Sequence, residues 1–426
     1  KRLFIKKKFV NMPEPLKNIK GTQDILFEDN NIWQYLELTI HKFLNKYGFS
    51  QIRTPIFENT NLFTRSIGTQ TDIVSKEMYS WVDQGNNNLT LKPEATASVA
   101  RSYIQHKLGK KNPINKLYYI DVLFRRERPQ KGRFRQFNQF GVEAIGSKYP
   151  EQDAEIIALA YNFYKGLNIK NLTLKINSIG SPEVRIKYKE ALKKYLIPYK
   201  DKLSKISKKR LETNPLRILD TKIDFELEII KNIPPIIDFL NQSDKEHFSK
   251  VLELLDSLSI KYIVDNKLVR GLDYYCRTVF EIQSINLGSQ DALCGGGRYD
   301  YLIEELGGKA TPAFGFAAGI ERLILALNEK ELSLSKRPDI YIIITDDTYL
   351  SHSFKISESL RSKNLVVIND MLRRSLKSQM KDANRLNACY TIIIGEDEIK
   401  NDKIAIKNMD SGNQDYVSLN KIESYF

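Results

Sequence analysis

Residues 117–145 constrain the fold of this chain more strongly than any other segment. Leu-Tyr-Tyr-Ile-Asp-Val-Leu-Phe at 117–124 and Phe-Asn-Gln-Phe-Gly-Val-Glu-Ala-Ile at 137–145 both have the composition typical of β-strands. The connection between them, residues 125–135, carries six cationic side chains and one carboxylate. The sequence therefore predicts two strands joined by a strongly basic loop.

The basic loop predicts a phosphate-binding site. Arginine offers a planar fork that binds phosphate oxygens in pairs, and such charge-assisted hydrogen bonds are about twice as strong as neutral ones. On the second strand, the two-residue period places Gln139, Gly141 and Glu143 on one face, and the glycine leaves room for a small polar pocket. The alternatives are a solvated loop and a surface position for Glu143.

Residues 313–327 predict a strand of small residues that runs into an apolar helix. Arg322 falls in the first turn of that helix, where the positive end of the helix dipole disfavours cations. An arginine at this place indicates an anion bound nearby. The alternative is an ordinary buried helix whose arginine reaches solvent.

Two further segments combine glycine with arginine and tyrosine: Leu-Val-Arg-Gly-Leu-Asp-Tyr-Tyr at 268–275 and Cys-Gly-Gly-Gly-Arg-Tyr-Asp at 294–300. Glycine lets backbone and ligand approach closely, although Gly-rich turns are common. Neither segment has the G-x-G-x-x-G pattern, and the chain contains no G-x-x-x-x-G-K-[ST]. Any ATP would therefore be held by neither a Rossmann turn nor a P-loop.

The composition favours a globular protein with a polyanionic partner. The chain has 426 residues, 42% of them hydrophobic, which is enough for two or three domains. The 66 Lys and Arg exceed the 52 Asp and Glu, and the net charge of +14 favours nucleic acid; a solvated Lys-rich surface is the alternative. Three cysteines without a C-x-x-C pair and four histidines without ligand spacing predict neither a disulfide framework nor a protein metal site.

The sequence predicts a cytoplasmic protein that does not span a membrane. No segment approaches the roughly 18 apolar residues of a membrane helix, and the first residues lack the apolar run of a secretion signal. Few cysteines fit a reducing compartment.

Hydrophobic periodicity divides the chain into domains. An amphipathic helix is expected over 29–47 and an extended edge or interface strand over 49–57. Lys, Leu and Ile at helical spacing then indicate a helical insertion, and strands alternating with helices indicate a final α/β domain. The expected domains are a basic extension at 1–16, one domain formed by 17–165 and 266–330, the helical insertion at 166–265, and the α/β domain at 336–426.

Three of these segments resemble motifs of class II aminoacyl-tRNA synthetases. Phe-Arg-x-Glu at 124–127, followed by the basic loop, resembles motif 2, and Gly-x-x-x-Gly-x-Glu-Arg at 315–322 resembles motif 3. Arg-Thr-Pro at 53–55 resembles motif 1.

Within that class, the segments 268–275 and 296–300 resemble the two signature blocks of the histidyl-tRNA synthetase family, and these blocks are highly specific. Lys-Gly-Thr-Gln-Asp at 20–24 and Pro-Glu-Ala-Thr at 93–96 also fit, although the family has Pro-Glu-Gly-Thr in the latter place. The resemblance covers nearly the whole chain from about residue 17 onward.

The resemblance implies an α+β fold: an antiparallel catalytic sheet flanked by helices, the helical insertion, and a C-terminal α/β anticodon-binding domain. It also implies a homodimer formed through the motif 1 side. In the implied reaction, ATP activates L-histidine to histidyl-adenylate with release of pyrophosphate, and the histidine then passes to the 3′ end of histidine tRNA. Mg²⁺ stays on the β- and γ-phosphates, while Arg270 takes the place of a metal ion at the α-phosphate.

The resemblance assigns roles to individual residues. The expected catalytic residues are three arginines: Arg125 and Arg270 at the α-phosphate, and Arg322 at the γ-phosphate. Arg125 also meets the histidine carboxylate, Glu127 the adenine, and Arg133 the γ-phosphate. The expected histidine-binding residues are Glu94, Thr96, Arg125, Gln139, Glu143, Arg270, Tyr274, Tyr275 and Tyr299, and the expected contacts with the tRNA acceptor end are Arg128 and Gln130.

Further RNA contacts are hypotheses of lower specificity. The basic run 205–210 in the insertion is expected either at the acceptor arm or on a solvated helix face. In the last domain, Arg373, Arg374 and Lys377 are candidates.

Two other kinds of protein share some of these motifs. The synthetase-like regulatory subunit of ATP phosphoribosyltransferase is a non-catalytic partner, but it generally lacks the anticodon module and parts of the signature blocks. Class II synthetases for proline, threonine or glycine would share motifs 2 and 3 without the two histidine blocks.

Overall fold

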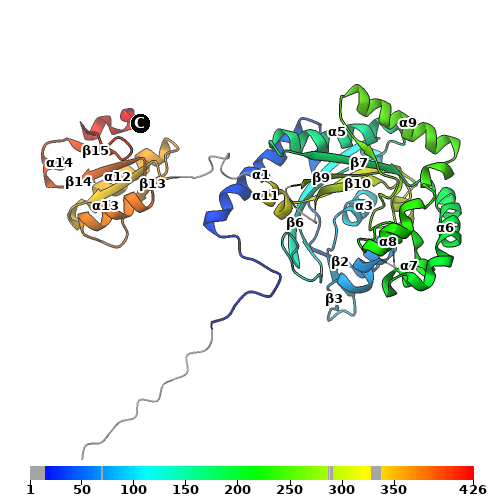
Figure 1. Cartoon of the computed structure of the whole chain (residues 1–426). Helices are drawn as coiled ribbons and strands as arrows, with labels where there is room; N and C mark the ends of the chain where they lie inside the picture. Colours follow the sequence, from blue (N-terminus) through cyan, green and yellow to red (C-terminus); the bar gives the residue numbers. More distant parts are fainter. Residues whose placement is uncertain (1–14, 69–70, 286, 288–290, 328–336) are drawn as a thin grey trace, which may run out of the picture. The chain divides into compact units, whose positions relative to one another are not determined.

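The computed structural model describes residues 15–68, 71–285, 287, 291–327 and 337–426. The predicted basic extension therefore lies almost entirely outside the described residues. The chain divides into two compact units, residues 1–332 and 333–426, which are described separately (Figure 1).

An eight-stranded sheet forms the centre of the first unit, with the strand order β1-β5-β6-β11-β10-β9-β7-β8. The interior pairs are antiparallel, and only the short edge strands β1 and β8 pair in parallel. The predicted antiparallel sheet is thus confirmed. Of the edge strand expected over 49–57, only Ser50–Gln51 lie at the edge of this sheet, and Phe57 begins a strand of a smaller sheet. The strands are β1 (Ser50–Gln51), β5 (Asn115–Phe124), β6 (Gln136–Ile145), β7 (Leu172–Ser178), β8 (Ile263–Val264), β9 (Cys276–Ser284), β10 (Ala292–Arg298) and β11 (Ala313–Gly319).

The two strands predicted around the basic loop are β5 and β6, which pair in antiparallel register. Gly141 lies opposite Tyr119, and a Cβ at Gly141 would stand 2.3 Å from the hydroxyl of that buried tyrosine. Glycine is therefore required here by close packing. The sequence analysis expected the space at Gly141 to form a small polar pocket, whereas Tyr119 fills it.

Helices pack against the eight-stranded sheet. The helix α1 has Trp33, Leu36 and Ile40 among its buried residues, as its amphipathic pattern predicts. Another helix, α5, packs on β7, β9, β10 and β11, and α9 lies against α5 (Figure 1). These helices are α1 (Phe27–Asn45), α2 (Thr60–Ile67), α3 (Thr96–Gln105), α4 (Leu108–Lys111), α5 (Pro150–Gly166), α10 (Leu302–Glu305) and α11 (Ile320–Ala326).

A three-stranded antiparallel sheet has the order β2-β4-β3, and α3 follows its central strand along the chain. Its strands are β2 (Phe57–Asn59), β3 (Ser80–Val82) and β4 (Asn88–Leu91), and a π-helical turn (Ile73–Glu77) precedes β3.

The predicted helical insertion differs from the structure at both ends. Residues Leu172–Ser178 form β7, which pairs with β9, and Ile263–Val264 form β8. Leu172, Leu174 and Ile176 alternate with polar residues, and this two-residue period indicates a strand, which the assignment of the whole region to helices overlooked. The helical part of this region, hereafter the helical segment, contains α6 (Pro182–Leu196), α7 (Lys205–Thr213), α8 (Asp224–Ile229) and α9 (Gln242–Ser257).

The second unit is the α/β domain that the sequence predicts. Its five-stranded sheet has the order β13-β12-β14-β15-β16, with parallel pairs around β12 and antiparallel pairs at β15. On one face of the sheet, Ile340 and Ile342 of β12 pack with Leu360 of α12. On the other face, Tyr341 of β12 packs with Ala383 of α13. The main elements are β12 (Ile340–Ile344), α12 (Leu350–Ser362), β13 (Val367–Asn369), α13 (Leu376–Arg385), β14 (Tyr390–Ile394), α14 (Glu396–Lys400), β15 (Ile404–Asn408), β16 (Gln414–Val417) and α15 (Ile422–Tyr425).

None of the helices in the described ranges has both the length and the apolar character needed to span a bilayer.

Candidate active site

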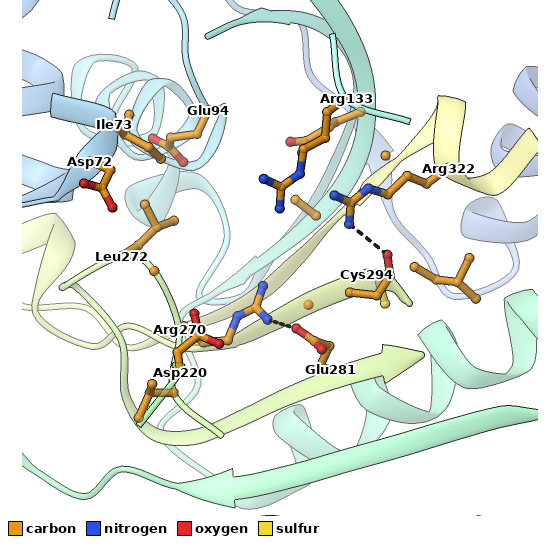
Figure 2. A pocket seen from close by; sticks show the side chains of 18 of the residues that line it. Asp72, Ile73, Glu94, Arg133, Asp220, Arg270, Leu272, Glu281, Cys294 and Arg322 are labelled. Atoms are coloured by element: carbon orange, nitrogen blue, oxygen red, sulfur yellow. Dashed lines mark hydrogen bonds and ion pairs between the residues drawn. The ribbon is translucent and has the colours of Figure 1, made fainter. Parts of the chain in front are cut away.

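A cavity of about 740 Å³ opens in the first unit, where the basic loop, the start of α3, the segment 268–275 and strands β10 and β11 converge (Figure 2). The sequence spreads these segments over some 230 positions, and the sheet order brings them together. The predicted site residues that line the cavity are Glu94, Thr96, Arg125, Glu127, Arg133, Gln139, Arg270, Tyr274, Tyr275 and Arg322.

Arg125 stands at the end of β5, where the strand passes into the basic loop. Its Nε donates a hydrogen bond to the carbonyl of Pro93 at 2.9 Å, and its guanidinium lies over the ring of Phe137 at 5.2 Å from the centroid. The Glu127 carboxylate is 3.9 Å from Arg125 and 3.4 Å from Arg133. One carboxylate therefore spaces two cations along the same wall.

Arg322 projects from the first turn of α11 toward the side where Arg133 lies (Figure 2). Its Nη1 donates to the carbonyl of Ala292 at 3.1 Å. Burial, and then repulsion by Arg133, lowers the pKa of Arg322. Two cations that oppose each other in a partly buried wall favour an anion between them, which supports the phosphate site predicted from the sequence.

Arg270 enters the cavity from the segment before β9. Its guanidinium donates to the carboxylate of Glu281, which also accepts a hydrogen bond from Gln283 at 2.7 Å. Gly295 makes room for this side chain, since a Cβ there would lie 2.3 Å from the guanidinium. The Gly-rich block at 294–297 is thus part of strand β10 rather than a turn, and Gly295 lets the Arg270 side chain lie close to the strand.

A buried polar cluster centred on Glu143 lies behind the wall of the cavity. Thr96 donates from Oγ1 to one oxygen of Glu143 at 2.7 Å, and the Tyr299 hydroxyl donates to the other. Burial raises the pKa of Glu143 to about 8, even though both hydrogen bonds act to lower it. Gly315 provides the space, because its Cβ would stand 2.0 Å from Glu143 Oε2.

Glu94 and two tyrosines complete this end of the cavity. The Glu94 carboxylate accepts from the backbone N–H groups of Thr96 and Ala97 at 2.9 and 2.8 Å, at the N-terminus of α3. Burial raises the pKa of Glu94, and these hydrogen bonds oppose the rise. Tyr274 packs against Tyr275, with ring centroids 4.6 Å apart.

Four predicted site residues lie away from the cavity wall. Glu143 and Tyr299 are each about 1% exposed and stand one layer behind it. Arg128 and Gln130 are exposed in the basic loop, outside the cavity.

The sequence reasoning missed Glu281, which holds Arg270. Glu281 and Gln283 are polar residues two positions apart in the otherwise largely buried strand β9. The two-residue period puts them on one face, and this pattern was the available signal. A second omission is Asp72, which lines the cavity and pairs with Arg217 of the helical segment at 2.8 Å.

The comparisons with known proteins agree with this geometry. Residues 21–191 and 203–323 match the family model for histidyl-tRNA synthetase, and residues 339–426 match that for an anticodon binding domain. The histidine–tRNA ligase of Staphylococcus haemolyticus is 46% identical over 413 residues, covering 96% of this chain and 98% of that protein.

Solved structures give the same result. The crystal structure of apo S. aureus histidyl-tRNA synthetase superposes with a TM-score of 0.82 at 40% identity, covering 97% of this chain and all of that one. A Bacillus halodurans structure described as an ATP phosphoribosyltransferase regulatory subunit/histidyl-tRNA synthetase has a TM-score of 0.67 at 22% identity, covering 90% of this chain and all of that one, which is a likeness of fold alone. The family model covers more than half of the chain, and the chain therefore belongs to the histidyl-tRNA synthetase family.

Proposed function

We propose that this chain is a histidine–tRNA ligase, which activates L-histidine with ATP to histidyl-adenylate, releases pyrophosphate, and transfers histidine to the 3′ end of its tRNA. The observation that carries the proposal is one cavity whose wall combines arginines from three separate segments with the polar side chains of Glu94, Thr96 and Gln139. Cations fixed before the reaction stabilise the charge that grows on phosphate oxygens, while these polar groups suit a small polar side chain.

At the nucleotide end, Arg125 and Arg270 contact the α-phosphate, and Arg133 and Arg322 contact the γ-phosphate. Glu127 binds the adenine. The support for this assignment is the common wall that these side chains share and the pairing of Arg270 with Glu281, which holds its guanidinium inside the cavity. Such positioning lets the histidine carboxylate meet the α-phosphorus without a covalent enzyme intermediate.

At the amino-acid end, Glu94, Thr96 and Gln139 bind the histidine, with Tyr274 and Tyr275 closing the pocket. Glu143 recognises the imidazole. It lies behind the cavity wall, where Thr96 and Tyr299 each donate a hydrogen bond to its carboxylate. Arg125 meets the histidine carboxylate. A site that hydrogen-bonds its substrate rejects analogues lacking the group by roughly 10⁴-fold or more, which makes editing unnecessary.

The transfer RNA contacts both units. Arg128 and Gln130 are exposed in the basic loop, where an acceptor end could reach the cavity. The second unit, residues 337–426, reads the anticodon; here Arg373 and Lys377 are exposed, whereas Arg374 is held by Asp370 and Asp382.

Magnesium would be carried by the ATP phosphates. Within the described ranges, no three His, Cys, Asp or Glu side chains are grouped so as to hold a metal ion. The ion supplies charge neutralisation on the leaving pyrophosphate, and the arginines hold the rest of the phosphate chain.

The enzyme acts as a homodimer in the cytoplasm. Support for a subunit contact on the motif 1 side comes from the exposed apolar side chains of Phe57 and Trp81, which lie on the two outer strands of the three-stranded sheet with their ring centroids 6.0 Å apart. A patch of this kind is typical of protein interfaces.

The test is exchange of labelled pyrophosphate into ATP by the purified chain, with magnesium and each of the twenty amino acids in turn. Exchange with histidine alone is expected. Exchange with another amino acid would favour a different class II specificity, and no exchange from a folded protein would favour the regulatory subunit.

A further inference from the structure

One arginine of the helical segment reaches into the substrate loop, residues 270–275. Arg185 lies in the first turns of α6, some 90 positions before that loop. Its Nη1 donates hydrogen bonds to the carbonyl oxygens of Asp273 and Tyr275 at 3.2 and 2.8 Å. These two carbonyls flank Tyr274, so a single side chain fixes the backbone on both sides of that residue.

The substrate loop needs such support because its backbone is irregular. Throughout these six described positions the chain is neither helix nor strand. Asp273 donates its N–H to the carbonyl of Ile67 at 3.3 Å, and its carboxylate accepts from Asn214 at 3.1 Å. Arg185 satisfies two more backbone carbonyls of this loop, in partly buried positions.

Space behind the loop makes this support decisive. A second cavity, of about 370 Å³, is lined by Arg185, Asp273 and Tyr274 together with residues of α10. Tyr274 lines both cavities, so the loop has open space on more than one side at this residue. Its ring packs on Tyr275 and Tyr299, at centroid distances of 4.6 and 5.6 Å. Where the loop faces the second cavity there are no packed atoms, and the hydrogen bonds from Arg185 hold its backbone there.

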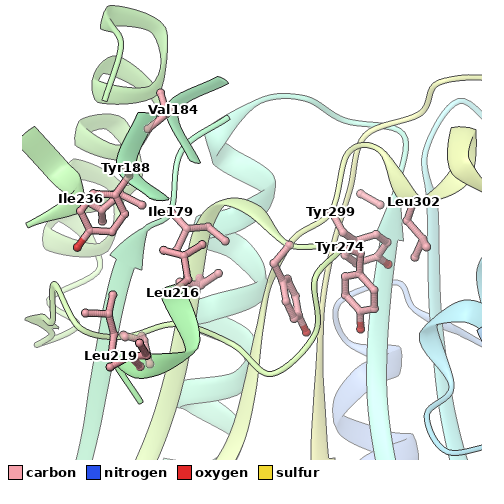
Figure 3. Close-up of a cluster of buried hydrophobic side chains, with 14 of the residues drawn as sticks. Ile179, Val184, Tyr188, Leu216, Leu219, Ile236, Tyr274, Tyr299 and Leu302 are labelled. Carbon is pink, nitrogen blue, oxygen red and sulfur yellow. The ribbon is translucent and has the colours of Figure 1, made fainter. Parts of the chain in front are cut away.

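The helix that carries Arg185 is firmly packed. Its neighbours Val184 and Tyr188 are buried in a hydrophobic cluster that runs from the helical segment to Tyr274 and Tyr299 (Figure 3). The Tyr188 hydroxyl also donates to the carbonyl of Pro234 at 2.9 Å. The helix α6 thus forms a rigid base from which Arg185 can hold the loop.

We propose that Arg185 is a positioning residue for histidine activation: it acts through the substrate loop, setting Tyr274 and Tyr275 at the amino-acid end of the cavity. This inference rests on the proposed function. It gives the helical segment a part in the adenylation step, beyond any contact with RNA. Arg185 touches the loop near the tyrosines, whereas Arg270, at the other end of the loop, is held separately by Glu281. Loss of Arg185 should therefore weaken binding of histidine more than binding of ATP, which Arg125, Arg133 and Arg322 also hold.

The test compares Arg185→Ala and Arg185→Lys with two controls on the same helix. Tyr188→Phe removes one hydrogen bond to a backbone carbonyl within the helical segment, and Lys187→Ala removes an exposed charge. Arg185→Ala is expected to raise the KM for histidine in pyrophosphate exchange by roughly tenfold or more, with a small change in the KM for ATP. Arg185→Lys, which keeps a cationic donor, should recover part of the loss, and both controls should keep the wild-type KM for histidine.

A purely structural role predicts a different pattern. Fewer folded molecules would lower kcat and leave the KM for histidine unchanged, as in Tyr188→Phe, and that result would overturn the proposal. The rise in Tm on adding histidine alone gives a second readout, which Arg185→Ala should diminish; an undiminished rise would count against it. If Arg185→Ala does not fold, Arg185→Lys carries the same comparison. Absence of exchange in the wild type would refute the proposed function, and the histidine-induced Tm shift would still test the role of Arg185.

Discussion

The carboxylate of Glu281 accepts a hydrogen bond from the guanidinium of Arg270, and the two side chains face each other at the wall of the large cavity (Figure 2). Both are partly buried, with side-chain exposures of 17% and 23%. A charge-assisted pair of this kind fixes the direction of the guanidinium before any ligand arrives. Glu281 therefore belongs to the site, although it need not touch a substrate.

Arg270→Ala is expected to lower kcat for histidine-dependent pyrophosphate exchange by about 10²–10³-fold, as loss of one fixed transition-state donor does in other enzymes. The Tm should remain close to that of the wild type, because the side chain lines a preformed cavity. A near-normal exchange rate in a folded variant would contradict the role given to Arg270.

Glu281→Gln provides the companion measurement. The amide keeps the shape and one acceptor but removes the negative charge, so Arg270 stays in place with less constraint. The loss in exchange should be clearly smaller than for Arg270→Ala. Equal losses would indicate that Glu281 itself contacts the reacting groups.

Gly295→Ala tests the close approach between strand β10 and Arg270. A Cβ at Gly295 would lie 2.3 Å from the guanidinium, so Arg270 must move out of its pairing with Glu281. Exchange should fall by roughly tenfold or more, as a displacement of about 1 Å at a reacting centre can cost about 100-fold. Gly166→Ala is the control, because its Cβ would meet no atom within 4 Å, and it should leave exchange unchanged.

Local patterns in the sequence identified most of the elements that build the site. The strand pair around the basic loop, the helix α1, the strand-to-helix step at Gly319 and the C-terminal α/β domain all follow from hydrophobic period and turn chemistry. The order of the strands in the sheet could not be predicted from local patterns. The residues of β10 and β11 do not indicate that these strands lie between β6 and β9, because that order depends on long-range pairing.

The contacts that the sequence did not reveal are those between distant segments. Strand β7 is a different case, because the alternation of Leu172, Leu174 and Ile176 with polar residues is a local strand signal inside a region that is otherwise rich in helical spacings. The pairing of Glu281 with Arg270 and that of Asp72 with Arg217 depend on where loops meet, and spacing along the chain does not encode this. The resemblance to a known family supplied the candidate residues, whereas the structure supplied the partners that hold them.

The raised pKa of Glu143 predicts how stability depends on pH. Its folded-state pKa of about 8 lies above its usual value of 4.5, chiefly because of burial. The protonated form is thus favoured in the folded protein, and its stabilising contribution is fully present below about pH 4.5 and lost as the pH rises through about 8. Glu143→Gln is neutral throughout. The unfolding free energy of the variant relative to the wild type should therefore increase between those pH values, as measured by denaturant titration; a difference that does not vary with pH would contradict the assignment.

Asp153 provides a test of stability outside the site. Its buried carboxylate accepts hydrogen bonds from Arg298 at 3.0 Å and from His247 at 2.8 Å, joining β10, α5 and α9. Asp153→Asn removes one of the two carboxylates that pair with the buried guanidinium; Asp300, at 3.0 Å from Arg298, remains. Breaking a buried ion pair typically costs about 3–5 kcal/mol, and the remaining partner should keep the loss at or below the lower end of that range. Glu253→Gln, which breaks the exposed pair with Lys250, should change the Tm little. Equal effects of the two variants would show that the buried network is not important for the fold.

Removal of residues 336–426 separates the two chemical steps. The second unit has hydrophobic clusters of its own, and the residues that line the large cavity all belong to the first unit. The shortened chain should keep histidine-dependent pyrophosphate exchange within a few-fold of the wild type. Charging of tRNA should fall by roughly a hundredfold or more, because the phosphate contacts made by the anticodon-binding unit are lost. Circular dichroism and Tm of the fragment control for its folding; an equal loss of exchange and charging in a folded fragment would mean that the second unit serves adenylate formation rather than tRNA binding.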